Sequence, residues 1–522
     1  MTRPATGSLV APSWPDTDAG FIGLFREHAR LTPQRLFAAI GGRPLTFGTL
    51  EEDATALAAW LRSKGVGQGD RVALMLRNGK AALALMLAIA RTGSVWVPIN
   101  PQAIGDNLAY IVVHASPRLV IAEADLLPAI AACGADASTN VIAVGGLAGE
   151  LALAAPTVRG SDAPPTFSAD APFAIMYTSG TTGRPKGVIV SHRMLRLAGE
   201  AVALVCDPAE GDVLYLWEPL FHIGGAQMIV LPLIRTVSLA LAERFSARRF
   251  WADLRAAHAS HLHYLGGILQ ILLKQPPGPL DRAHGARIAW GGGCPADVWQ
   301  AFETRFGVKI RECYGMTECS SITTANLDGP IGSVGKPVPW FEVAVVDAAG
   351  APLAAGGRGQ ILVRERLPGA LSRGYFKAQC ATAAAWREGA FLTGDLASWD
   401  TQGNLYFHGR MTDSVRVRGE NVAAAEVEDV ARKHPAIEDC AMIGVAAEVG
   451  EGDIKLFVAL RRGAKLSASE LSAWLSRSLA PYQRPRYIAF IDAFERTPSA
   501  RIIKHALSKR THDCWDVGPA KG

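Results

Sequence analysis

The segment from Tyr177 to Gly187, YTSGTTGRPKG, gathers residue types that can bind phosphate groups. Backbone N–H groups near glycine and the hydroxyls of Ser and Thr can surround phosphate oxygens, and a lysine adds a mobile positive charge. Pro185 and Gly187 stand where a Walker A loop has Gly and Ser or Thr, so this is a different kind of phosphate loop. A plain surface loop rich in turn formers is the alternative. The order of residue types favours nucleotide binding by Thr178, Ser179, Gly180, Thr181, Thr182, Gly183 and Lys186.

Four further segments contain residue types suited to nucleotide chemistry. They are the triple glycine at 291–293, the YGMTE sequence at 314–318, the TGD sequence at 393–395, and Gly409-Arg410 followed by RGEN at 418–421. Taken alone each is weak, because a triple glycine or a TGD tripeptide is also ordinary turn chemistry. A lone glutamate on a loop is usually solvated.

In their order and rough spacing, these segments resemble the adenylate-forming superfamily of acyl-CoA synthetases, luciferases and peptide-synthetase adenylation domains. The resemblance covers about residues 20 to 510 and implies that the loop at 177–187 holds the β- and γ-phosphates of ATP. The carboxylate of an acid substrate then attacks the α-phosphorus, in a reaction that requires in-line positioning and charge neutralisation. Mg2+ is implied as well.

The resemblance also assigns roles to single residues. Gly291, Gly292 and Gly293 resemble the wall of an adenine pocket. In the YGMTE motif, Tyr314 would stack on adenine, Thr317 would touch the α-phosphate and Glu318 would help hold Mg2+, with Gly315 and Met316 completing the turn. Asp395 would accept hydrogen bonds from both ribose hydroxyls, and Arg410 would bind ribose or phosphate. The hinge position, usually Asp or Lys in relatives, is Thr412 here.

The stretch RTPSARIIKHALSKR at 496–510 departs from the family at its catalytic lysine. Arg501 stands where that lysine is expected, and Lys504 follows three residues later. Arg and Lys are not equivalent, because a guanidinium is planar and forked and an ammonium is a compact point charge. Three alternatives follow: Arg501 is the catalytic cation, Lys504 is the catalytic cation, or adenylation is impaired. We slightly favour Lys504. Either residue can also be a solvated surface charge.

The segment PLFHIGGAQ at 219–227 resembles the acid-binding region of the family. By this resemblance His222 lies near the carboxylate, and Gly224 and Gly225 line the acyl pocket. Tyr264 and Trp217 shape the pocket or belong to the core, and a histidine among apolar residues is more often a core residue. Several stretches are most similar to the crotonobetaine/carnitine-CoA ligase-like branch, which implies a carboxylic acid substrate and coenzyme A as acceptor. A different acceptor, such as a carrier protein, and a degenerate nucleotide-binding protein without activity are the alternatives.

The elements that must position these residues follow an α/β pattern. A helix ending before Gly65, a strand at 71–76, a helix at 80–91 and a strand at 95–100 predict a doubly wound, mostly parallel sheet. After Gly409 the pattern changes to a helix at 422–433, strands at 440–446 and 455–460, a helix capped by Ser467 or Ser469 and a strand at 486–491. We therefore expect a large ATP- and acid-binding domain at 1–409 and a small, mobile α+β lid domain at 410–522, joined by a hinge.

Composition excludes several classes of protein. The 522 residues are 49% apolar and 19% charged, which is typical of a globular enzyme of more than one domain. The formal charge of +5 arises from 53 basic and 48 acidic residues without a dense basic run, so no nucleic-acid partner is expected.

The apolar run at 81–90 is too short to span a membrane and the N-terminus lacks a secretory signal, so we expect a cytoplasmic protein. None of the eight cysteines has zinc-site spacing, and a homodimer is left open.

Overall fold

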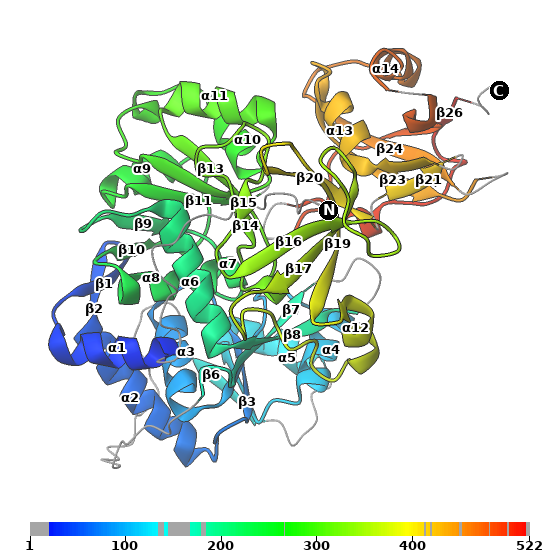
Figure 1. The fold of residues 1–522 in the computed structure, drawn as a ribbon. Helices are drawn as coiled ribbons and strands as arrows, with labels where there is room; N and C mark the ends of the chain where they lie inside the picture. Colours follow the sequence, from blue (N-terminus) through cyan, green and yellow to red (C-terminus); the bar gives the residue numbers. More distant parts are fainter. Residues whose placement is uncertain are drawn as a thin grey trace. The chain divides into compact units, whose positions relative to one another are not determined.

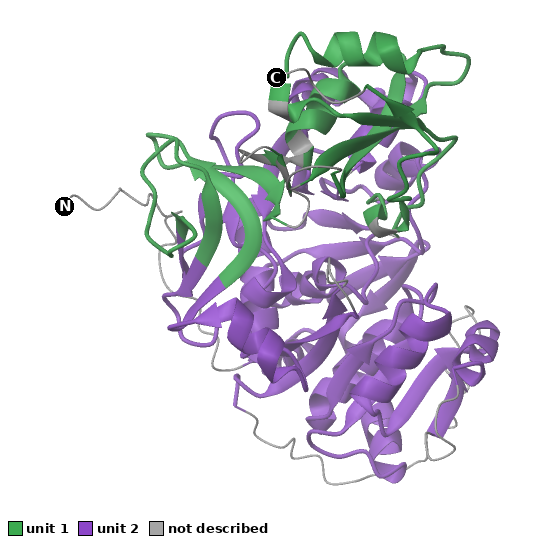
Figure 2. Ribbon diagram, turned by 90° about the vertical axis from the view of Figure 1, so that its right-hand side faces the viewer, with its two compact units in different colours: residues 1–4, 344–362, 392–522 green, residues 5–343, 363–391 purple. Residues whose placement is uncertain are grey.

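A computed structural model gives the fold of the chain (Figure 1). It describes residues 20–133, 140–144, 168–178, 184–265, 267–411, 414–417, 420–447, 452–479, 481–497 and 501–517. By clustering of contacts the chain divides into two compact units, shown in separate colours in Figure 2. The larger unit comprises residues 5–343 and 363–391, and the smaller comprises residues 1–4, 344–362 and 392–522. Thus 344–362 and 392–409, which we expected in the large domain, group with the C-terminal part.

One sheet of the larger unit ends in the predicted phosphate loop. Its order in the described residues is β6 (Asn140–Val144), β5 (Leu119–Glu123), β3 (Arg71–Met75), β4 (Val95–Pro98), β7 (Pro172–Thr178) and β8 (Lys186–Ser191). All neighbours are parallel except β7 and β8, which form an antiparallel pair. The expected strands at 71–76 and 95–100 are confirmed as β3 and β4.

A second sheet of the same unit holds the other predicted nucleotide residues of this unit. Its order in the described residues is β15 (Lys336–Pro337), β14 (Thr324–Ala325), β13 (Lys309–Tyr314), β12 (Ile288–Gly292), β11 (His261–Leu265), β9 (Val213–Leu216), β10 (Ser238–Leu241), β1 (Leu36–Ile40) and β2 (Arg43–Thr46). The strands from β1 to β13 along this order are parallel, and β2, β14 and β15 run antiparallel to their neighbours. Ligands of such sheets bind beyond the carboxyl ends of the parallel strands.

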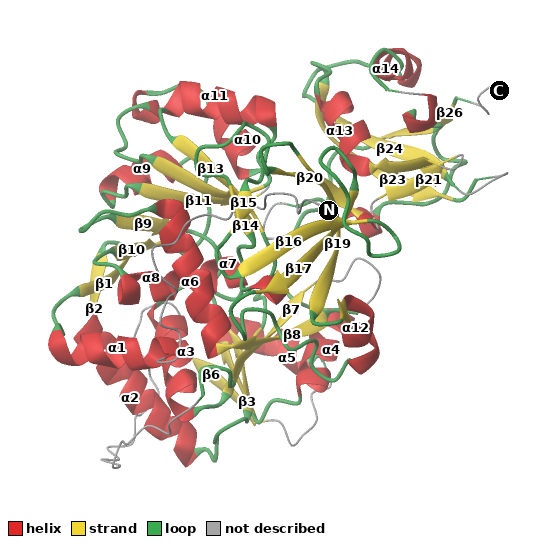
Figure 3. Ribbon diagram, in the orientation of Figure 1, coloured by secondary structure: helices red, strands yellow, loops and turns green. Residues whose placement is uncertain are grey.

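The helices of the larger unit alternate with its strands, as Figure 3 shows. They are α1 (Gly20–Leu31), α2 (Phe47–Ser63), α3 (Lys80–Thr92), α4 (Gly105–Ala115), α5 (Leu127–Ala131), α6 (His192–Cys206), α7 (Ile223–Ala226), α8 (Leu231–Ile234), α9 (Phe250–Ala256), α10 (Ile268–Leu273), α11 (Ala296–Phe306) and α12 (Gln379–Ala385). In α2, the Thr46 hydroxyl accepts a hydrogen bond from the Thr49 N–H at 3.2 Å and caps the N-terminus. Leu50, Leu57 and Leu61 form its buried stripe, which confirms the helix predicted there.

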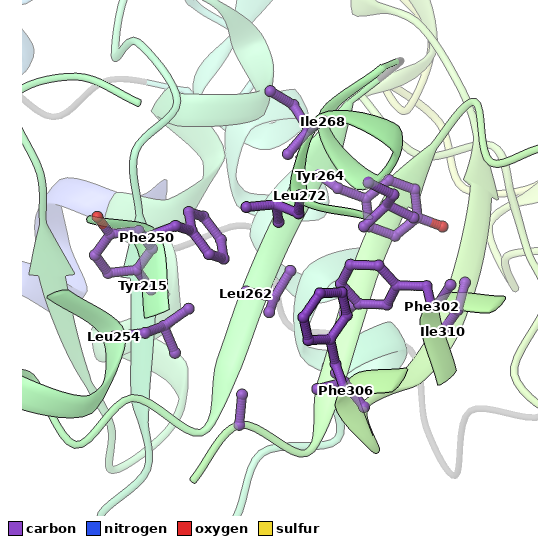
Figure 4. Close-up of a cluster of buried hydrophobic side chains, with 14 of the residues drawn as sticks. Tyr215, Phe250, Leu254, Leu262, Tyr264, Ile268, Leu272, Phe302, Phe306 and Ile310 are labelled. Atoms are coloured by element: carbon purple, nitrogen blue, oxygen red, sulfur yellow. The ribbon is translucent and has the colours of Figure 1, made fainter. Parts of the chain in front are cut away.

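Apolar side chains fill the space between the second sheet and its covering helices. Figure 4 shows the cluster in which Leu262 and Tyr264 of β11 contact residues of α9, α10 and α11. Phe302 and Phe306 of α11 are almost completely buried there. Burial of an aromatic side chain stabilises a fold by about 1.5–3 kcal/mol, so this cluster fixes the strands that present the site.

A further sheet contains β16 (Phe341–Val346), β17 (Gly359–Glu365), β19 (Ala390–Trp399) and β18 (Trp386–Arg387), with β20 (Leu405–Arg410) paired to β19. The division between the units falls within β16, β17 and β19.

The C-terminal part of the smaller unit is the α+β module predicted from the sequence. It contains β21 (Ser414–Val417), β22 (Glu420–Ala423), α13 (Ala424–Arg432), β23 (Ile437–Val445), β24 (Asp453–Leu460), α14 (Ala468–Leu475), β25 (Tyr487–Phe490) and β26 (Trp515–Asp516). Ser467 and Glu470 form a capping box at the start of α14, so Ser467 is the N-cap. Met442, Leu456 and Leu471 belong to its own buried core. The predicted α/β fold class, with a large N-terminal part and a small C-terminal part, is therefore confirmed.

Two sequence-based exclusions can be compared with the structure. No helix in the described part of the chain is both long and apolar enough to cross a membrane. Within the same residues, no group of three or more His, Cys, Asp or Glu side chains is arranged to hold a metal ion. The eight cysteines are free thiols.

Candidate active site

The two ends of the predicted phosphate loop are held by an antiparallel pair of strands. Thr178, the last residue of β7, pairs with Lys186, the first residue of β8, and Tyr177 pairs with Gly187. Ser179, Gly180, Thr181, Thr182 and Gly183 lie outside the described residues. The Tyr177 hydroxyl lies 2.7 Å from His114 Nδ1, and burial raises the pKa of Tyr177. The base of the loop is therefore anchored to α4 through Tyr177.

Tyr375 joins the phosphate loop to the predicted magnesium ligand. The ammonium of Lys186 lies 4.9 Å from the centre of the Tyr375 ring, in a cation–π contact. The Tyr375 hydroxyl donates a hydrogen bond of 3.0 Å to Glu318 Oε1. Burial, reinforced by the Glu318 charge, raises the pKa of Tyr375, so this hydroxyl stays a donor at neutral pH. The structure thus brings Lys186 and Glu318, 132 residues apart in the numbering, into contact with one tyrosine: Lys186 with its ring and Glu318 with its hydroxyl.

The YGMTE residues form a tight turn directly after β13. Tyr314 ends this strand, and Thr317 and Glu318 begin the 3-10 turn η4 (Thr317–Cys319). A side chain on Gly315 would overlap the backbone carbonyl of Ser321, so only glycine fits. Met316 accepts backbone hydrogen bonds from Cys319 and Ser321 at 3.0 and 3.1 Å. Tyr314, Thr317 and Glu318 are all less than 9% exposed, so these three are buried and are not solvated loop residues.

The triple glycine ends β12 next to β13. A side chain on Gly291 would overlap the Tyr264 carbonyl, and a Cβ on Gly292 would lie 2.9 Å from the Cys313 carbonyl oxygen. The backbone N–H groups of Gly293 and Cys294 donate to Glu312 Oε1 at 2.6 and 3.1 Å. The close backbone neighbours therefore require glycine at 291 and 292, and the role of this backbone as an adenine wall remains a prediction.

Glu312, which the sequence did not single out, holds this wall in place. Besides the two N–H groups, its carboxyl accepts a hydrogen bond from the Tyr264 hydroxyl. Burial raises the pKa of Glu312 to about 7, and burial together with the Glu312 charge raises the pKa of Tyr264. Tyr264 is completely buried in the core cluster of Figure 4, so its hydroxyl positions Glu312; a role in the acid pocket remains a prediction.

The segment predicted to bind the acid contains the short helix α7. His222 directly precedes this helix and is partly exposed, with its ring 4.6 Å from that of Phe221. A side chain on Gly225 would overlap the Pro219 carbonyl, and a Cβ on Gly224 would lie 2.5 Å from both carboxylate oxygens of Glu218. Trp217 is buried and donates from its indole N–H to the His263 carbonyl at 2.7 Å. This segment begins just beyond the carboxyl end of β9, whose neighbours in the sheet are β11 and β10.

The predicted ribose-binding residues belong to the smaller unit. Asp395, 5% exposed, pairs with Arg410 across β19 and β20, and their side chains are 3.8 Å apart from Arg410 Nε to Asp395 Oδ1. The Thr393 hydroxyl accepts from the Asp395 N–H at 3.1 Å and donates to the Ile361 carbonyl at 3.0 Å. Gly394 has φ 76°, a backbone conformation that favours glycine. The TGD motif is thus a fixed part of strand β19. The hinge residue Thr412 lies outside the described residues.

The two candidate catalytic cations differ in their surroundings. Lys504 begins the 3-10 turn η7 (Lys504–Ala506), and its ammonium lies 2.8 Å from Oε1 of Glu428 in α13. Arg501 is exposed, and its N–H donates to the Thr497 hydroxyl at 3.1 Å while its carbonyl accepts from the Thr497 N–H at 2.8 Å. Lys504 therefore takes part in the packing of the small module. Arg501 directly precedes Ile502, which forms an isolated antiparallel β-bridge with Arg496.

A magnesium ion requires oxygen ligands in an octahedral arrangement, commonly one or two carboxylates with phosphate oxygens and water. The buried Glu318 carboxylate, with Lys186 across the same tyrosine, fits this chemistry. Sequence reasoning found Glu318 and Lys186 but missed Tyr375 and Glu312. Tyr375 stands in RGYFK at 373–377, where no motif marked it.

Comparisons with known proteins identify the family of this chain. Residues 25–376 match the family model of AMP-binding enzymes, and residues 426–501 match that of the AMP-binding enzyme C-terminal domain. The chain is 32% identical to a sulfoacetate–CoA ligase of Cupriavidus necator over 90% of this chain and 94% of the relative. It is 31% identical to a crotonobetaine/carnitine–CoA ligase of Salmonella paratyphi B over 89% of this chain and 93% of the relative.

A solved structure gives the same result for the fold. The ATP-bound MatB of Rhodopseudomonas palustris superimposes with a TM-score of 0.84 at 28% identity, covering 93% of this chain and 98% of that chain. Because the family model covers more than half of the sequence and the relatives match nearly the whole chain at 31–32% identity, the chain belongs to the family of AMP-binding, adenylate-forming enzymes.

Proposed function

We propose that the protein is an ATP-dependent acyl-CoA ligase, which converts a carboxylic acid to an acyl-AMP and passes the acyl group to coenzyme A. The observation that supports this most directly is the arrangement of Lys186, Tyr375 and Glu318 at the base of the phosphate loop. The relatives named as CoA ligases, which match nearly the whole chain, support coenzyme A as the acceptor.

In the first half-reaction the protein's task is positioning and charge neutralisation. Lys186 and the loop that begins at Thr178 bind the β- and γ-phosphates, and Glu318 holds Mg2+, which neutralises phosphate charge. The backbone at 291–293 lies against adenine, Tyr314 stacks on it, and Thr317 contacts the α-phosphate. Asp395 accepts from the ribose hydroxyls. His222 orients the acid at the α-phosphorus, and a cation of the last motif, Arg501 or Lys504, faces the developing charge.

In the second half-reaction the C-terminal module changes its orientation about residues 410–413, so that one site serves both reactions. The thiol of coenzyme A then attacks the acyl carbon and AMP leaves. A different acceptor is the alternative within the same chemistry. A cytoplasmic location and a homodimer are expectations of the same proposal.

A coupled assay tests the proposal directly. The protein is incubated with ATP, Mg2+ and a panel of short, branched, aromatic and charged carboxylic acids, and acid-dependent release of pyrophosphate is measured. Addition of coenzyme A should then produce acyl-CoA and AMP in equal amounts. ATP binding without pyrophosphate release for every acid would instead identify a nucleotide-binding protein without ligase activity.

A further inference from the structure

Three buried polar side chains lie together behind Gly224 in the predicted acid pocket. Glu218, His263 and Gln227 are 2%, 3% and 1% exposed. Glu218 comes two residues after the end of β9, His263 lies in the neighbouring strand β11, and Gln227 follows α7. Gln227 ends the PLFHIGGAQ segment, but no mechanistic step described above uses any of the three.

Their contacts centre on Gly224. Nδ1 of His263 lies 2.8 Å from Oε2 of Glu218, and Gln227 donates from Nε2 to the Gly224 carbonyl at 3.1 Å. A Cβ on residue 224 would lie 2.5 Å from both oxygens of Glu218. The missing side chain at position 224 therefore lets the Glu218 carboxylate lie directly against the backbone of the pocket segment.

The hydrogen bonding of this group is incomplete. Glu218 Oε2 and His263 Nδ1, 2.8 Å apart, are each other's ion-pair partner, whereas Gln227 Oε1 has no hydrogen-bond partner among the described residues. Buried polar atoms in folded proteins are almost always paired, because an unpaired one costs about 1–3 kcal/mol. The unpaired Gln227 oxygen, next to a buried carboxylate in the predicted pocket segment, is suited to a ligand group that donates hydrogen bonds.

The aromatic surroundings favour one kind of ligand group. The His263 ring lies 4.2 Å from that of Trp290 and 6.3 Å from that of Trp217, measured between ring centres. These rings surround His263 and fix it beside Glu218, and the carboxylate of Glu218 attracts cations and donors of hydrogen bonds. A second anionic group would instead meet the Glu218 carboxylate at close range, in a buried environment where like charges repel strongly.

Within the proposed ligase function, we propose that Glu218, supported by His263, determines the substrate class. The acid carries a hydrogen-bond donor or a cationic group at the end opposite its reacting carboxylate, and that group reaches Glu218 past Gly224. Acids with a second carboxylate or a sulfonate are rejected, and plain alkyl acids are weak substrates.

Matched acids test this selection. Two series differ only in the terminal group: butanoate, 4-hydroxybutanoate, 4-aminobutanoate and butanedioate, and their six-carbon counterparts. For the wild type we expect kcat/KM for pyrophosphate release to be at least about tenfold higher with the amino or hydroxy acid than with the alkyl or dicarboxylic acid. Glu218→Gln should reduce that ratio at least about tenfold, mainly through KM. Gly224→Ala, which displaces the carboxylate, should change the ratio in the same direction.

Glu200→Gln is the matched control. Glu200 in α6 is another partly buried carboxylate in an ion pair, 2.7 Å from Arg196, and it lies outside the pocket segment. This variant should keep the selectivity of the wild type. Equal selectivity of wild type and Glu218→Gln, in a folded and active variant, would overturn the inference while leaving the ligase function intact.

A binding measurement separates the inference from the proposed function. Thermal unfolding of the wild type with ATP, Mg2+ and each acid should show greater stabilisation by the amino and hydroxy acids, and Glu218→Gln should lose this difference. If no acid releases pyrophosphate, the ligase proposal fails, yet the same thermal shifts still support or refute recognition by Glu218. If Glu218→Gln does not fold, Gly224→Ala provides the same comparison.

Discussion

The ammonium of Lys504 lies 2.8 Å from Oε1 of Glu428, a carboxylate that is 7% exposed. The same carboxylate accepts from Arg432 Nη2 at 3.0 Å and from the Met442 N–H at 2.7 Å. Lys504 would have to leave this network to reach a nucleotide. The ion pair gives Lys504 a structural role in the small module, and whether Lys504 or Arg501 faces the phosphate stays a prediction.

Substitution of the two cations should have opposite effects on stability and activity. Lys504→Ala removes one of the two positive charges beside the Glu428 carboxylate and should lower the free energy of unfolding by about 1–3 kcal/mol. Pyrophosphate release by this variant, measured well below its melting temperature, should stay close to that of the wild type. Arg501→Ala should lower pyrophosphate release by about 10²-fold without a change in melting temperature. Lys433→Ala, an exposed lysine after α13, serves as the control. Loss of activity on Lys504→Ala in a fully stable protein would restore Lys504 as the catalytic residue.

Removal of the Tyr375 hydroxyl should affect the magnesium dependence of the reaction. Tyr375→Phe keeps the ring under Lys186 but removes the donor to Glu318 Oε1. We expect a Mg2+ requirement shifted by about tenfold or more, since a hydrogen bond to a charged group contributes about 1.5–3 kcal/mol and about 1.4 kcal/mol corresponds to a factor of ten. Titration of Mg2+ at saturating ATP measures the shift. An unchanged titration would separate Tyr375 from the metal-binding role of Glu318.

The glycine in the YGMTE turn should not tolerate a side chain. Gly315→Ala places a Cβ onto the Ser321 carbonyl and should destabilise the protein by about 1–3 kcal/mol, with loss of ATP binding. Gly23→Ala is the control, because no atom lies within 4 Å of its Cβ position and the residue is helical. That substitution should be neutral or stabilising by about 0.5–1 kcal/mol. Chemical denaturation and nucleotide calorimetry of both variants would show the contrast.

Stability should depend on pH through Glu312. Burial raises the pKa of Glu312 from 4.5 to about 7 in the folded protein. Between these values the folded state holds a proton that the unfolded state has lost, so the free energy of unfolding falls as pH rises through this window and levels off above about pH 7. Glu312→Gln should remove this contribution, because its amide does not ionise. The difference in denaturant unfolding between wild type and variant from pH 4.5 to 8 measures it. A difference that is independent of pH would contradict the burial effect.

Local sequence patterns predicted the elements well. The apolar spacing of Leu50, Leu57 and Leu61 identified α2, and Ser467 identified the start of α14, because both signals act within one or two helical turns. The motif residues Lys186 and Glu318 were found for a similar reason, since each stands in a contiguous segment with several matching residues.

Long-range contacts could not be predicted in the same way. Tyr375 is 57 residues from Glu318 and has an ordinary composition around it, so only the fold shows that it joins Glu318 to Lys186. The pairing of Glu312 with Tyr264 and that of Lys504 with Glu428 also depend on which strands and helices become neighbours. The unit boundary differs for the same reason, because residues 344–362 and 392–409 are assigned by contacts and not by sequence order.

The register between Thr178 and Lys186 has a consequence for how this site can evolve. Paired residues of adjacent strands stay about 5 Å apart, so β7 and β8 form a fixed frame whatever side chains connect them. Replacement of connecting residues therefore leaves the frame intact and changes mainly nucleotide affinity and turnover. Insertion of a single residue within β7, in contrast, would turn every following side chain of that strand to the opposite face and change which residue pairs with Lys186.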